Sequence, residues 1–430
     1  MFDDLINRKK KIAVVGLGYV GLPLAKLLST KYDVIGFDVN QYKIDMYQKG
    51  VDLIDECDNL NDFNITFTSD EDMIGEANFI IVTVPTPINE DNTPDLAFIK
   101  SSTEIVAKNM PKNSIVVYES TVYPGVTEDV CVPILERCSG YKLCRDFKVG
   151  YSPERVSSGK NNMKISDITK IVSAIDDESL DIISNVYDSV LDKGIYRAKS
   201  IKVAEAAKIT ENIQRDVNIA LVNELSKIYN QMDINVQDVL DAASTKWNFV
   251  KYEPGLVGGH CIGVDPYYLI HQSRNLKYPT QLISTARVVN ESMVDYIYEN
   301  VVNLLEMNDI ELDDAKILVC GITFKENCND IRNSKIINVI NKLIEAGVDI
   351  TANDPCAVED EVREVYNLSL SDDVKDKFDA IIMSASHYEY ENWDYDKFKE
   401  LSKDKIILID LKEKFKDKMV DKDDVCYWSL

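Results

Sequence analysis

Short apolar runs alternate with longer amphipathic segments through the first 200 residues of the chain. The runs are rich in Val and Ile, and the segments between them are long enough to form helices. This alternation is typical of a parallel sheet with helices packed on both faces. The expected strands cover residues 11–15, 34–38, 79–84, 114–119, 148–151 and 170–174. We therefore expect a doubly wound parallel sheet in this part of the chain.

A different pattern begins near residue 200, where apolar residues recur at the helical period of about 3.6 over long stretches. The stretches 201–232 and 279–305 flank a Gly- and Pro-rich loop at 253–266. Strand-like runs then return at 316–321, 349–353, 380–384 and 405–411. This order predicts an α/β protein in which two Rossmann-like doubly wound parallel-sheet domains are joined by a central all-helical domain. The expected domain boundaries are 1–199, 200–308 and 309–430.

Composition limits the classes of partner. The 73 acidic and 48 basic residues leave a net charge of -25, which disfavours nucleic acid and anionic membrane surfaces. Nine cysteines without paired CxxC spacing and three histidines support neither a zinc site nor a disulfide framework. We find no apolar signal segment, and no run approaches the roughly 18 apolar residues of a membrane span. A soluble, metal-free protein of the reducing cytoplasm is expected.

A glycine fingerprint follows the first expected strand and precedes a helix-length segment. It reads Gly16-Leu17-Gly18-Tyr19-Val20-Gly21. The first glycine permits a tight turn, the second lets the backbone approach a pyrophosphate, and the third lets helix and strand pack closely. Asp38 ends the next expected strand about 20 residues later, where a carboxylate accepts hydrogen bonds from the adenosine ribose and repels a 2′-phosphate. NAD is therefore the expected cofactor.

Polar residues follow two further expected strands. Thr86 lies in the motif VPTP, and Ser120 and Thr121 lie in the motif EST. Ligands of open parallel sheets bind beyond the carboxyl ends of the strands, so these side chains are candidates for cofactor or substrate contact. Ser and Thr at strand ends also serve as helix caps, and position alone leaves both interpretations open.

Lys208, Asn212 and Arg215 share one face of the helix expected for 201–232. Such a face can hold an anionic or hydroxyl-rich substrate, or stabilise a developing oxyanion. A solvated charged stripe is the commoner interpretation of this pattern when the helix is taken alone.

The candidate nucleophile is Cys261, inside the turn Gly258-Gly259-His260-Cys261-Ile262-Gly263-Val264-Asp265-Pro266. A free cysteine is usually an inert small apolar residue. A thiol beside a hydride-accepting cofactor, however, suggests oxidation of a carbonyl through a sulfur-bound intermediate. Asp265 opposes thiolate formation by its like charge, so we interpret it as an orienting or water-binding group and assign the electrostatic support to Lys208. His260 receives no role, because sequence neighbours often point apart.

Several motifs occur in the order seen in the UDP-glucose/GDP-mannose dehydrogenase family. They are GLGYVG, VPTP, EST, Ser152-Pro153-Glu154, EAAK with Asn212, GGHCIGVDP and GITFK. Together they extend over nearly the whole chain, which therefore resembles this family closely. The segment from Lys246-Trp247-Asn248-Phe249 into GGHCIGVDPYYL looks most like the branch that acts on UDP-N-acetylhexosamines, the Vi-antigen and capsule type.

The resemblance implies four-electron oxidation of the sugar C6 alcohol to a carboxylate with two NAD, for surface polysaccharide biosynthesis. Lys208 and Asn212 resemble the residues that hold the oxyanion, and Thr121 and Glu154 those that organise a catalytic water or transfer protons. The Cys261 thiolate then captures the aldehyde as a thiohemiacetal, which is oxidised to a thioester. Water, assisted by Glu154 or Asp265, releases the uronate.

Further contacts are implied by the resemblance. Lys325 of GITFK approaches the substrate, and Asp330, Arg332 and Ser334 begin a UDP-binding helix. The expected cofactor contacts are Gly16, Gly18, Tyr19, Val20, Gly21, Asp38, Thr86, Ser120, Thr121 and Lys325. The expected substrate contacts are Glu154, Arg155, Lys208, Asn212, Arg215, Tyr252, Gly255, Gly258, Gly259 and Lys325. The resemblance also implies a homodimer.

One departure from the family pattern bears on the substrate. UDP-glucose members typically carry a second glutamate four positions after the first, where this chain has Ser158, and Arg155 follows Glu154 directly. We therefore favour UDP-GlcNAc or UDP-GalNAc, with UDP-glucose or UDP-ManNAc as the alternative. Two other functions stay open: a two-electron dehydrogenase of the 6-phosphogluconate or hydroxyacyl type, which needs no thiol, and an NAD-binding regulator without turnover.

Overall fold

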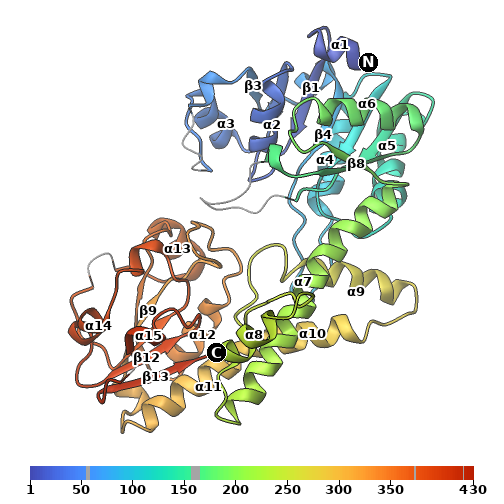
Figure 1. Cartoon of the computed structure of the whole chain (residues 1–430). Coiled ribbons are helices and arrows are strands. Elements are labelled where there is room, and N and C mark those ends of the chain that lie inside the picture. Colours follow the sequence, from blue (N-terminus) through green and yellow to red (C-terminus); the bar gives the residue numbers. More distant parts are fainter. Residues whose placement is uncertain (55–58, 156–164, 372–373, 420) are drawn as a thin grey trace. The chain divides into compact units, whose positions relative to one another are not determined.

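The structure is a computed structural model that describes residues 1–54, 59–155, 165–371, 374–419 and 421–430, so Ser158 lies outside the described residues. The chain divides into two compact units. The first comprises Met1–Glu211 and Tyr267–Pro279, and the second Asn212–Pro266 and Thr280–Leu430. The long helix α7 (Ile201–Asn230) begins in the first unit and ends in the second (Figure 1).

The first unit is built on one sheet, which has eight strands within the described residues, in the order β3-β2-β1-β4-β5-β6-β7-β8. Its strands are β1 (Lys11–Val15), β2 (Val34–Phe37), β3 (Ile65–Thr68), β4 (Ala77–Val82), β5 (Ser114–Tyr118), β6 (Phe147–Tyr151), β7 (Lys170–Ala174) and β8 (Ile195–Arg197). Its helices include α1 (Phe2–Ile6), α2 (Gly21–Ser29), α3 (Gln41–Gln48), α4 (Ala97–Asn109), α5 (Val132–Ser139), α6 (Asp177–Asp188) and α9 (Asp265–Asn275).

Alternate strand residues of this sheet face two separate cores, because successive side chains of a strand point to opposite faces. Ala13 and Val15 of β1 pack with residues of α4 and α5 on one face. Ile12 and Val14 of the same strand pack with residues of α2, α3 and α6 on the other. Both faces are therefore covered, as the apolar runs predict for a doubly wound sheet.

The sheet departs from the expected parallel order at one place. β7 pairs with β6 in the antiparallel direction, with Gly150 opposite Ala174 and Tyr151 opposite Ser173. All the other strand pairs described in this sheet are parallel. The residue at the start of β7 therefore lies at the edge of the sheet where β5 and β6 end. The sequence pattern located all six expected strands but did not reveal this direction, nor the short strands β3 and β8.

The second unit contains a five-stranded parallel sheet within its described residues, in the order β10-β9-β11-β12-β13. The strands are β9 (Lys316–Cys320), β10 (Asp349–Asn353), β11 (Ala380–Met383), β12 (Ile406–Asp410) and β13 (Val425–Ser429). The helices α12 (Ile336–Glu345), α13 (Glu359–Tyr366), α14 (Tyr395–Leu401) and α15 (Lys416–Met419) accompany them. Four of these strands were expected, and β13 was not.

Helices precede this sheet in the second unit. Besides most of α7 they are α8 (Val236–Ser244), α10 (Leu282–Glu291) and α11 (Met293–Glu306). The single expected stretch 279–305 is thus two helices that meet at Ser292. Met293, Ile297 and Val301 of α11 join the core that covers one face of the sheet, because they recur on one side of the helix.

Candidate active site

The glycine fingerprint forms a tight turn between β1 and α2. Gly16 has φ of +96°, its N–H donates to the Phe37 carbonyl at 2.8 Å, and its own carbonyl accepts from the Thr83 hydroxyl at 2.6 Å. A Cβ at Gly21 would lie 1.9 Å from the Gly16 carbonyl oxygen, so any side chain there would force the turn open. A Cβ at Gly18, in contrast, would have no atom within 4 Å. The turn is closed at Gly16 and Gly21 and open at Gly18.

This turn fits a dinucleotide. Open space over Gly18 allows a pyrophosphate to approach the backbone, and the N-terminus of α2 carries no side-chain cap that would compete for its N–H groups. Asp38 follows β2 with its side chain 10 % exposed, accepts from the N–H groups of Leu17 and Asn40 at 2.9 Å each, and lies 3.7 Å from the Lys43 ammonium. A fixed carboxylate at this place suits a ribose.

Hydrogen bonds bring the expected residues at the other strand ends together. The Ser120 hydroxyl donates to the Val84 carbonyl at 2.6 Å, and the Thr86 hydroxyl donates to the Thr121 carbonyl at 2.7 Å. Tyr268 of α9 donates its hydroxyl to the Thr86 carbonyl at 2.6 Å. The segments after β4 and β5 are therefore tied to each other at the carboxyl edge of the sheet.

Glu154 lies just after β6 at the same edge. Its carboxylate accepts from the N–H of Arg155 at 2.7 Å. The Arg155 guanidinium binds Glu211 of α7, with an N···O distance of 2.8 Å, and donates to the Thr169 carbonyl at 2.7 Å. The donors of Arg155 that we expected to meet the substrate thus contact the protein itself and fix the Glu154 segment to α7.

Three polar residues of α7 occupy buried positions that the sequence alone did not predict. Lys208 and Asn212, four residues apart, are both buried. Glu205, one turn earlier, accepts from the N–H groups of Gly125 and Thr127 at 2.6 and 3.0 Å. Burial raises the pKa of Glu205 to about 7, although these hydrogen bonds oppose the rise. Lys208 and Asn212 therefore face protein, whereas Arg215, the third residue of the expected face, is exposed.

In the second unit, Asp265 links α7 to the cysteine turn. The Asn212 amide donates to the Asp265 carboxylate at 2.5 Å, and the Asp265 N–H donates to the Cys261 carbonyl at 2.8 Å. A carboxylate that accepts from Asn212 is oriented by it, which agrees with the orienting role expected for Asp265.

The two glycines before the thiol are required by their surroundings. Gly259 has φ of +76°, and a Cβ there would lie 2.8 Å from the Phe324 ring. A Cβ at Gly258 would lie 2.5 Å from the Asn333 carbonyl, which accepts from the Gly259 N–H at 3.2 Å. The turn that carries Cys261 is thus seated on the segment that follows β9.

His260, to which the sequence assigned no role, lies in contact with the thiol. Its Nδ1 atom is 3.4 Å from the buried Asp330 carboxylate, which also binds Arg332 at 2.6 Å. The hydrogen bond to Asp330 and a second to the Cys261 side chain raise the pKa of His260 to about 9, while nearby Arg332 opposes the rise. The direction of a side chain in a tight turn depends on contacts 70 residues away, so adjacency could not reveal it.

Lys325 and Arg215 belong to the same electrostatic neighbourhood. Burial lowers the pKa of Lys325, with opposing contributions from Cys328, Cys261 and Asp330 and a lowering one from Arg215. Arg332, expected near the diphosphate, contacts Asp330 and His260 instead. Cys261 therefore interacts with two basic side chains of its own unit, His260 and Lys325, which in turn interact with Arg332 and Arg215.

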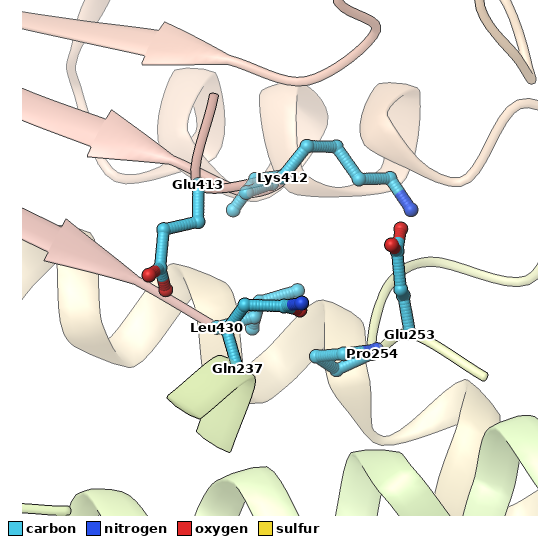
Figure 2. Close-up of a pocket in the computed structure, with 7 residues that line it drawn as sticks. Gln237, Glu253, Pro254, Lys412, Glu413 and Leu430 are labelled. Atoms are coloured by element: carbon cyan, nitrogen blue, oxygen red, sulfur yellow. The ribbon is translucent and has the colours of Figure 1, made fainter. Parts of the chain in front are cut away.

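The loop that precedes the thiol is held at its base. Tyr252 bonds to Gln214 at 2.9 Å, and the N–H of Gly255 donates to Asn223 of α7 at 2.7 Å. Figure 2 shows the Lys412 side chain pointing toward Glu253 across a small hollow. The hollow offers ≈ 10 Å³, space for about one water molecule. It supports the loop and is too small for a sugar nucleotide.

Asp354, Cys356 and His387 form a cluster whose side-chain donor atoms lie within 4.8 Å of one another. Nδ1 of His387 accepts from the Asn327 N–H at 2.8 Å, so the ring proton sits on Nε2, which lies 3.1 Å from the Asp354 carboxylate. Both ring nitrogens are thus engaged in hydrogen bonds. We assign this cluster to structural support of the second sheet.

The two sheets and the dinucleotide turn fit a class of protein, the NAD-dependent oxidoreductases. Comparison with known proteins gives the family. Models of the UDP-glucose/GDP-mannose dehydrogenase family match in three parts, the NAD-binding domain at residues 10–191, the central domain at 202–292 and the UDP-binding domain at 318–417. The chain belongs to this family and is an NAD-dependent UDP-sugar dehydrogenase.

Individual relatives are similar over almost the full length. Protein CapL of Staphylococcus aureus is 46 % identical over 89 % of this chain and 91 % of its own. A UDP-N-acetyl-D-glucosamine 6-dehydrogenase of Salmonella typhi is 45 % identical over 94 % of this chain and 96 % of its own. The solved structure of a UDP-D-ManNAc dehydrogenase from Pyrococcus horikoshii superposes with a TM-score of 0.88 at 28 % identity, covering 97 % of this chain and 98 % of the other. Among the described residues no helix is long and apolar enough to span a membrane.

Proposed function

We propose that this chain oxidises the C6 alcohol of UDP-GlcNAc or UDP-GalNAc to the uronate in two successive steps, for surface polysaccharide biosynthesis. The observation that carries the proposal is Cys261 in contact with His260 within a basic neighbourhood. The name of the Salmonella typhi relative supports an acetamido sugar as the substrate. An acetamido sugar also agrees with the Glu154-Arg155 motif.

Bound NAD supplies the hydride acceptor in both oxidations. The turn at Gly16, Gly18 and Gly21 would hold its pyrophosphate, and Asp38 its ribose. In the first oxidation the C6 hydroxyl proton must leave as the carbon loses hydride. We assign Lys208 and Asn212 to the developing oxyanion, and Thr121 and Glu154 to the water and proton transfers.

The second oxidation proceeds through sulfur. The Cys261 thiolate forms a C–S bond with the C6 aldehyde, and the carbonyl oxygen takes up a proton to give a thiohemiacetal. Loss of that hydroxyl proton and of a second hydride from C6 leaves a thioester. Water then adds to the thioester carbon, a base accepts one of its protons, and the C–S bond breaks to release the thiolate and the carboxylic acid, which gives its remaining proton to solvent. Asp265 and Glu154 are the assigned water-binding groups.

His260 supplies the electrostatic support for the thiolate in this scheme. An imidazolium beside a thiol favours the ionised sulfur. Asp330 keeps the imidazole protonated to higher pH, because a hydrogen-bonded carboxylate stabilises the charged ring. We therefore assign to His260 the role that sequence reasoning gave to Lys208.

The direct test is the Cys261→Ser variant with UDP-GlcNAc and NAD. We expect carboxylate formation to fall by at least about 10³-fold while NAD binding is unchanged, because a hydroxyl is a far weaker nucleophile than a thiolate. Cys426→Ser, a half-buried thiol of β13, is the matched control and should keep full activity. Full turnover by the Cys261 variant would overturn the thioester mechanism.

Counting products separates the alternatives. Two NADH per sugar support the four-electron reaction, and one supports a two-electron dehydrogenase. A panel of UDP-GlcNAc, UDP-GalNAc, UDP-ManNAc and UDP-glucose identifies the sugar. The names of more distant relatives, such as a UDP-N-acetyl-D-mannosamine dehydrogenase of Methanocaldococcus jannaschii at 32 % identity, and of the Pyrococcus horikoshii structure favour UDP-ManNAc. Binding of NAD and all four sugars without NADH formation would support a regulator instead.

We also propose a homodimer in the cytoplasm. Leu221 and Ile228 of α7 lie seven residues apart on one face of the helix and are exposed, as are Leu282 and Val288 of α10. A second copy could cover these side chains. All the described cysteines are free thiols, which suits a reducing compartment. Light scattering of Leu221→Asp tests the dimer, since a buried charge would favour the monomer.

A further inference from the structure

Lys170 reaches the carboxyl edge of the first sheet because β7 runs antiparallel to β6. As the first residue of β7, it lies where β5 and β6 end. Its ammonium is 2.7 Å from the carboxylate of Glu119, the residue after β5, and 3.4 Å from the carbonyl oxygen of Pro153. The Lys170 and Glu119 side chains are 6 % and 0 % exposed. The pair is therefore shut off from water.

Tyr187 of α6 completes this buried cluster. Its hydroxyl donates to the other oxygen of the Glu119 carboxylate, and the Lys170 ammonium lies 5.2 Å from the centre of its ring. Each charged group is thus satisfied by a named partner. Burying an ion pair in place of apolar residues rarely adds stability, so a cluster of this kind points to a role beyond holding the fold.

The cluster touches the segment that carries Glu154. The Pro153 carbonyl that accepts from Lys170 belongs to the peptide bond immediately before Glu154. Ser152 is also fixed, through its N–H to the Tyr118 carbonyl at 2.9 Å and its hydroxyl to the Ile171 carbonyl at 2.7 Å. On the other side, Arg155 binds Glu211. Glu154 is therefore held between anchors on both sides.

The charges of the cluster also act on Glu154. Burial raises the pKa of Glu119, the Lys170 ammonium opposes the rise, and the carboxylate of Glu154 adds to it. The repulsion between the two carboxylates is mutual, and Lys170 offsets it. Removing Lys170 would therefore leave two like charges facing each other at the end of the sheet.

We propose that Lys170, together with Glu119 and Tyr187, is a positioning residue that places the Glu154 carboxylate for proton transfer. This proposal rests on the proposed role of Glu154 in catalysis. Lys170 fixes the Glu154 backbone through the Pro153 carbonyl, and its ammonium balances the charge of the Glu119 carboxylate.

The test compares paired substitutions, because Lys170→Met alone would strand a buried carboxylate. The double variant Glu119→Gln with Lys170→Met keeps the volumes and removes both charges. The matched control is Lys148→Met with Asp176→Asn, which removes an ion pair at the opposite end of β6. Thermal melting and NAD titration establish that each variant is folded, and kcat, KM and the pH profile with UDP-GlcNAc follow.

For the Glu119/Lys170 double variant we expect kcat to fall about 10- to 100-fold, because a displaced proton-transfer group loses that much rate. The acid limb of the pH profile should shift, and NAD affinity should be unchanged. The Lys148/Asp176 control should keep kcat within about twofold, because this partly buried pair lies at the end of β6 away from Glu154. A separate Lys170→Arg variant, with Glu119 unchanged, should keep most of the wild-type rate, because a guanidinium can still bind Glu119.

Two outcomes are decisive. Wild-type kcat and pH profile in the folded double variant overturn the positioning role of Lys170. A Glu154→Gln variant measured in parallel separates this result from failure of the proposed mechanism: if Glu154→Gln retains full activity, the catalytic role of Glu154 is wrong, whatever the double variant does.

Discussion

The turn after β1 and the turn after β9 share one backbone design but differ in what they leave open. Gly16 and Gly321 both have positive φ, at +96° and +81°. Each donates its N–H to the carbonyl of the residue that ends the neighbouring strand, which is β2 for Gly16 and β10 for Gly321. Asp38 accepts from the Leu17 N–H at 2.9 Å, and Asp354 accepts from the Ile322 N–H at 2.6 Å. The scaffold of a dinucleotide site is therefore present twice.

The two turns diverge at the next residue. Gly18 leaves open space, whereas Thr323 places a hydroxyl that donates to the Lys325 carbonyl at 3.0 Å. Asp38 keeps part of its side chain exposed, whereas His387 covers Asp354, whose side chain is 0 % exposed. We therefore assign the ribose and pyrophosphate to the end of the first sheet, because the glycine there is open and the carboxylate accessible.

The largest effect is expected from a methyl group at Gly21. Gly21→Ala would place Cβ 1.9 Å from the Gly16 carbonyl, so we expect a loss of about 3 kcal/mol or more in unfolding free energy and no NAD binding. Gly18→Ala, in the same turn, should change the unfolding free energy by less than about 0.5 kcal/mol and weaken NAD binding at least about tenfold. Thermal melting and NAD titration check both. Equal melting temperatures of the Gly21→Ala and Gly18→Ala variants would contradict the conclusion that the turn has space for a side chain at Gly18 but none at Gly21.

Replacing each of the two carboxylates, Asp38 and Asp354, by an amide should separate NAD binding from stability. Asp38→Asn should weaken NAD binding about tenfold with little change in the melting temperature, since an amide oxygen can still accept from the backbone. Asp354→Asn should leave NAD affinity unchanged and cost about 2 kcal/mol, because the carboxylate accepts from the Ile322, Thr323, Cys356 and Ala357 N–H groups. The same loss of NAD affinity in both variants would show that the comparison is mistaken.

The smallest effect concerns acid stability. Burial alone would raise the pKa of Asp354, but the hydrogen bonds from His387 and the backbone outweigh it and lower the pKa below its ordinary value. A carboxyl with a lowered pKa stabilises the fold above its unfolded pKa, about 3.9, and loses that contribution as pH falls through the folded value.

His387→Phe should therefore cost about 1–2 kcal/mol at pH 7 and progressively less below about pH 4. Melting temperatures between pH 3 and pH 7 check this, with His271→Phe in α9 as the control. A loss of stability in His387→Phe that does not depend on pH would indicate that His387 acts through packing and that the charge of Asp354 plays no role.

Local chemistry explains which parts of the site could be predicted. Gly16, Gly18, Gly21 and Asp38 act through the backbone of one strand-turn-helix unit, so their spacing carries their geometry. The apolar runs located β1 and β7 for the same reason. Cys261 was a candidate because its glycine-rich turn accompanies a dinucleotide fingerprint, and the family resemblance supplied its role in the reaction.

Features that depend on contacts between distant segments escaped prediction. The direction of β7 is set by pairing with β6, and only that direction brings Lys170 to Glu119. The orientation of His260 depends on Asp330 and Arg332, about 70 residues later. Thr323 and His387, from the segments that follow β9 and β11, close the second turn. Such residues look like ordinary polar positions until the fold assembles them.

Glu205 has a consequence for the heat of unfolding. Its carboxyl has a folded pKa of about 7 against an ordinary value of 4.5, so the protonated form is favoured in the fold and the stability it contributes is lost as pH rises through 7. Near neutral pH the folded protein therefore carries a proton that the unfolded chain gives up to the buffer. Calorimetric enthalpies should accordingly depend on the ionisation heat of the buffer chosen. Glu205→Gln should reduce that dependence but not abolish it, because His260, with a folded pKa of about 9, also releases a proton on unfolding.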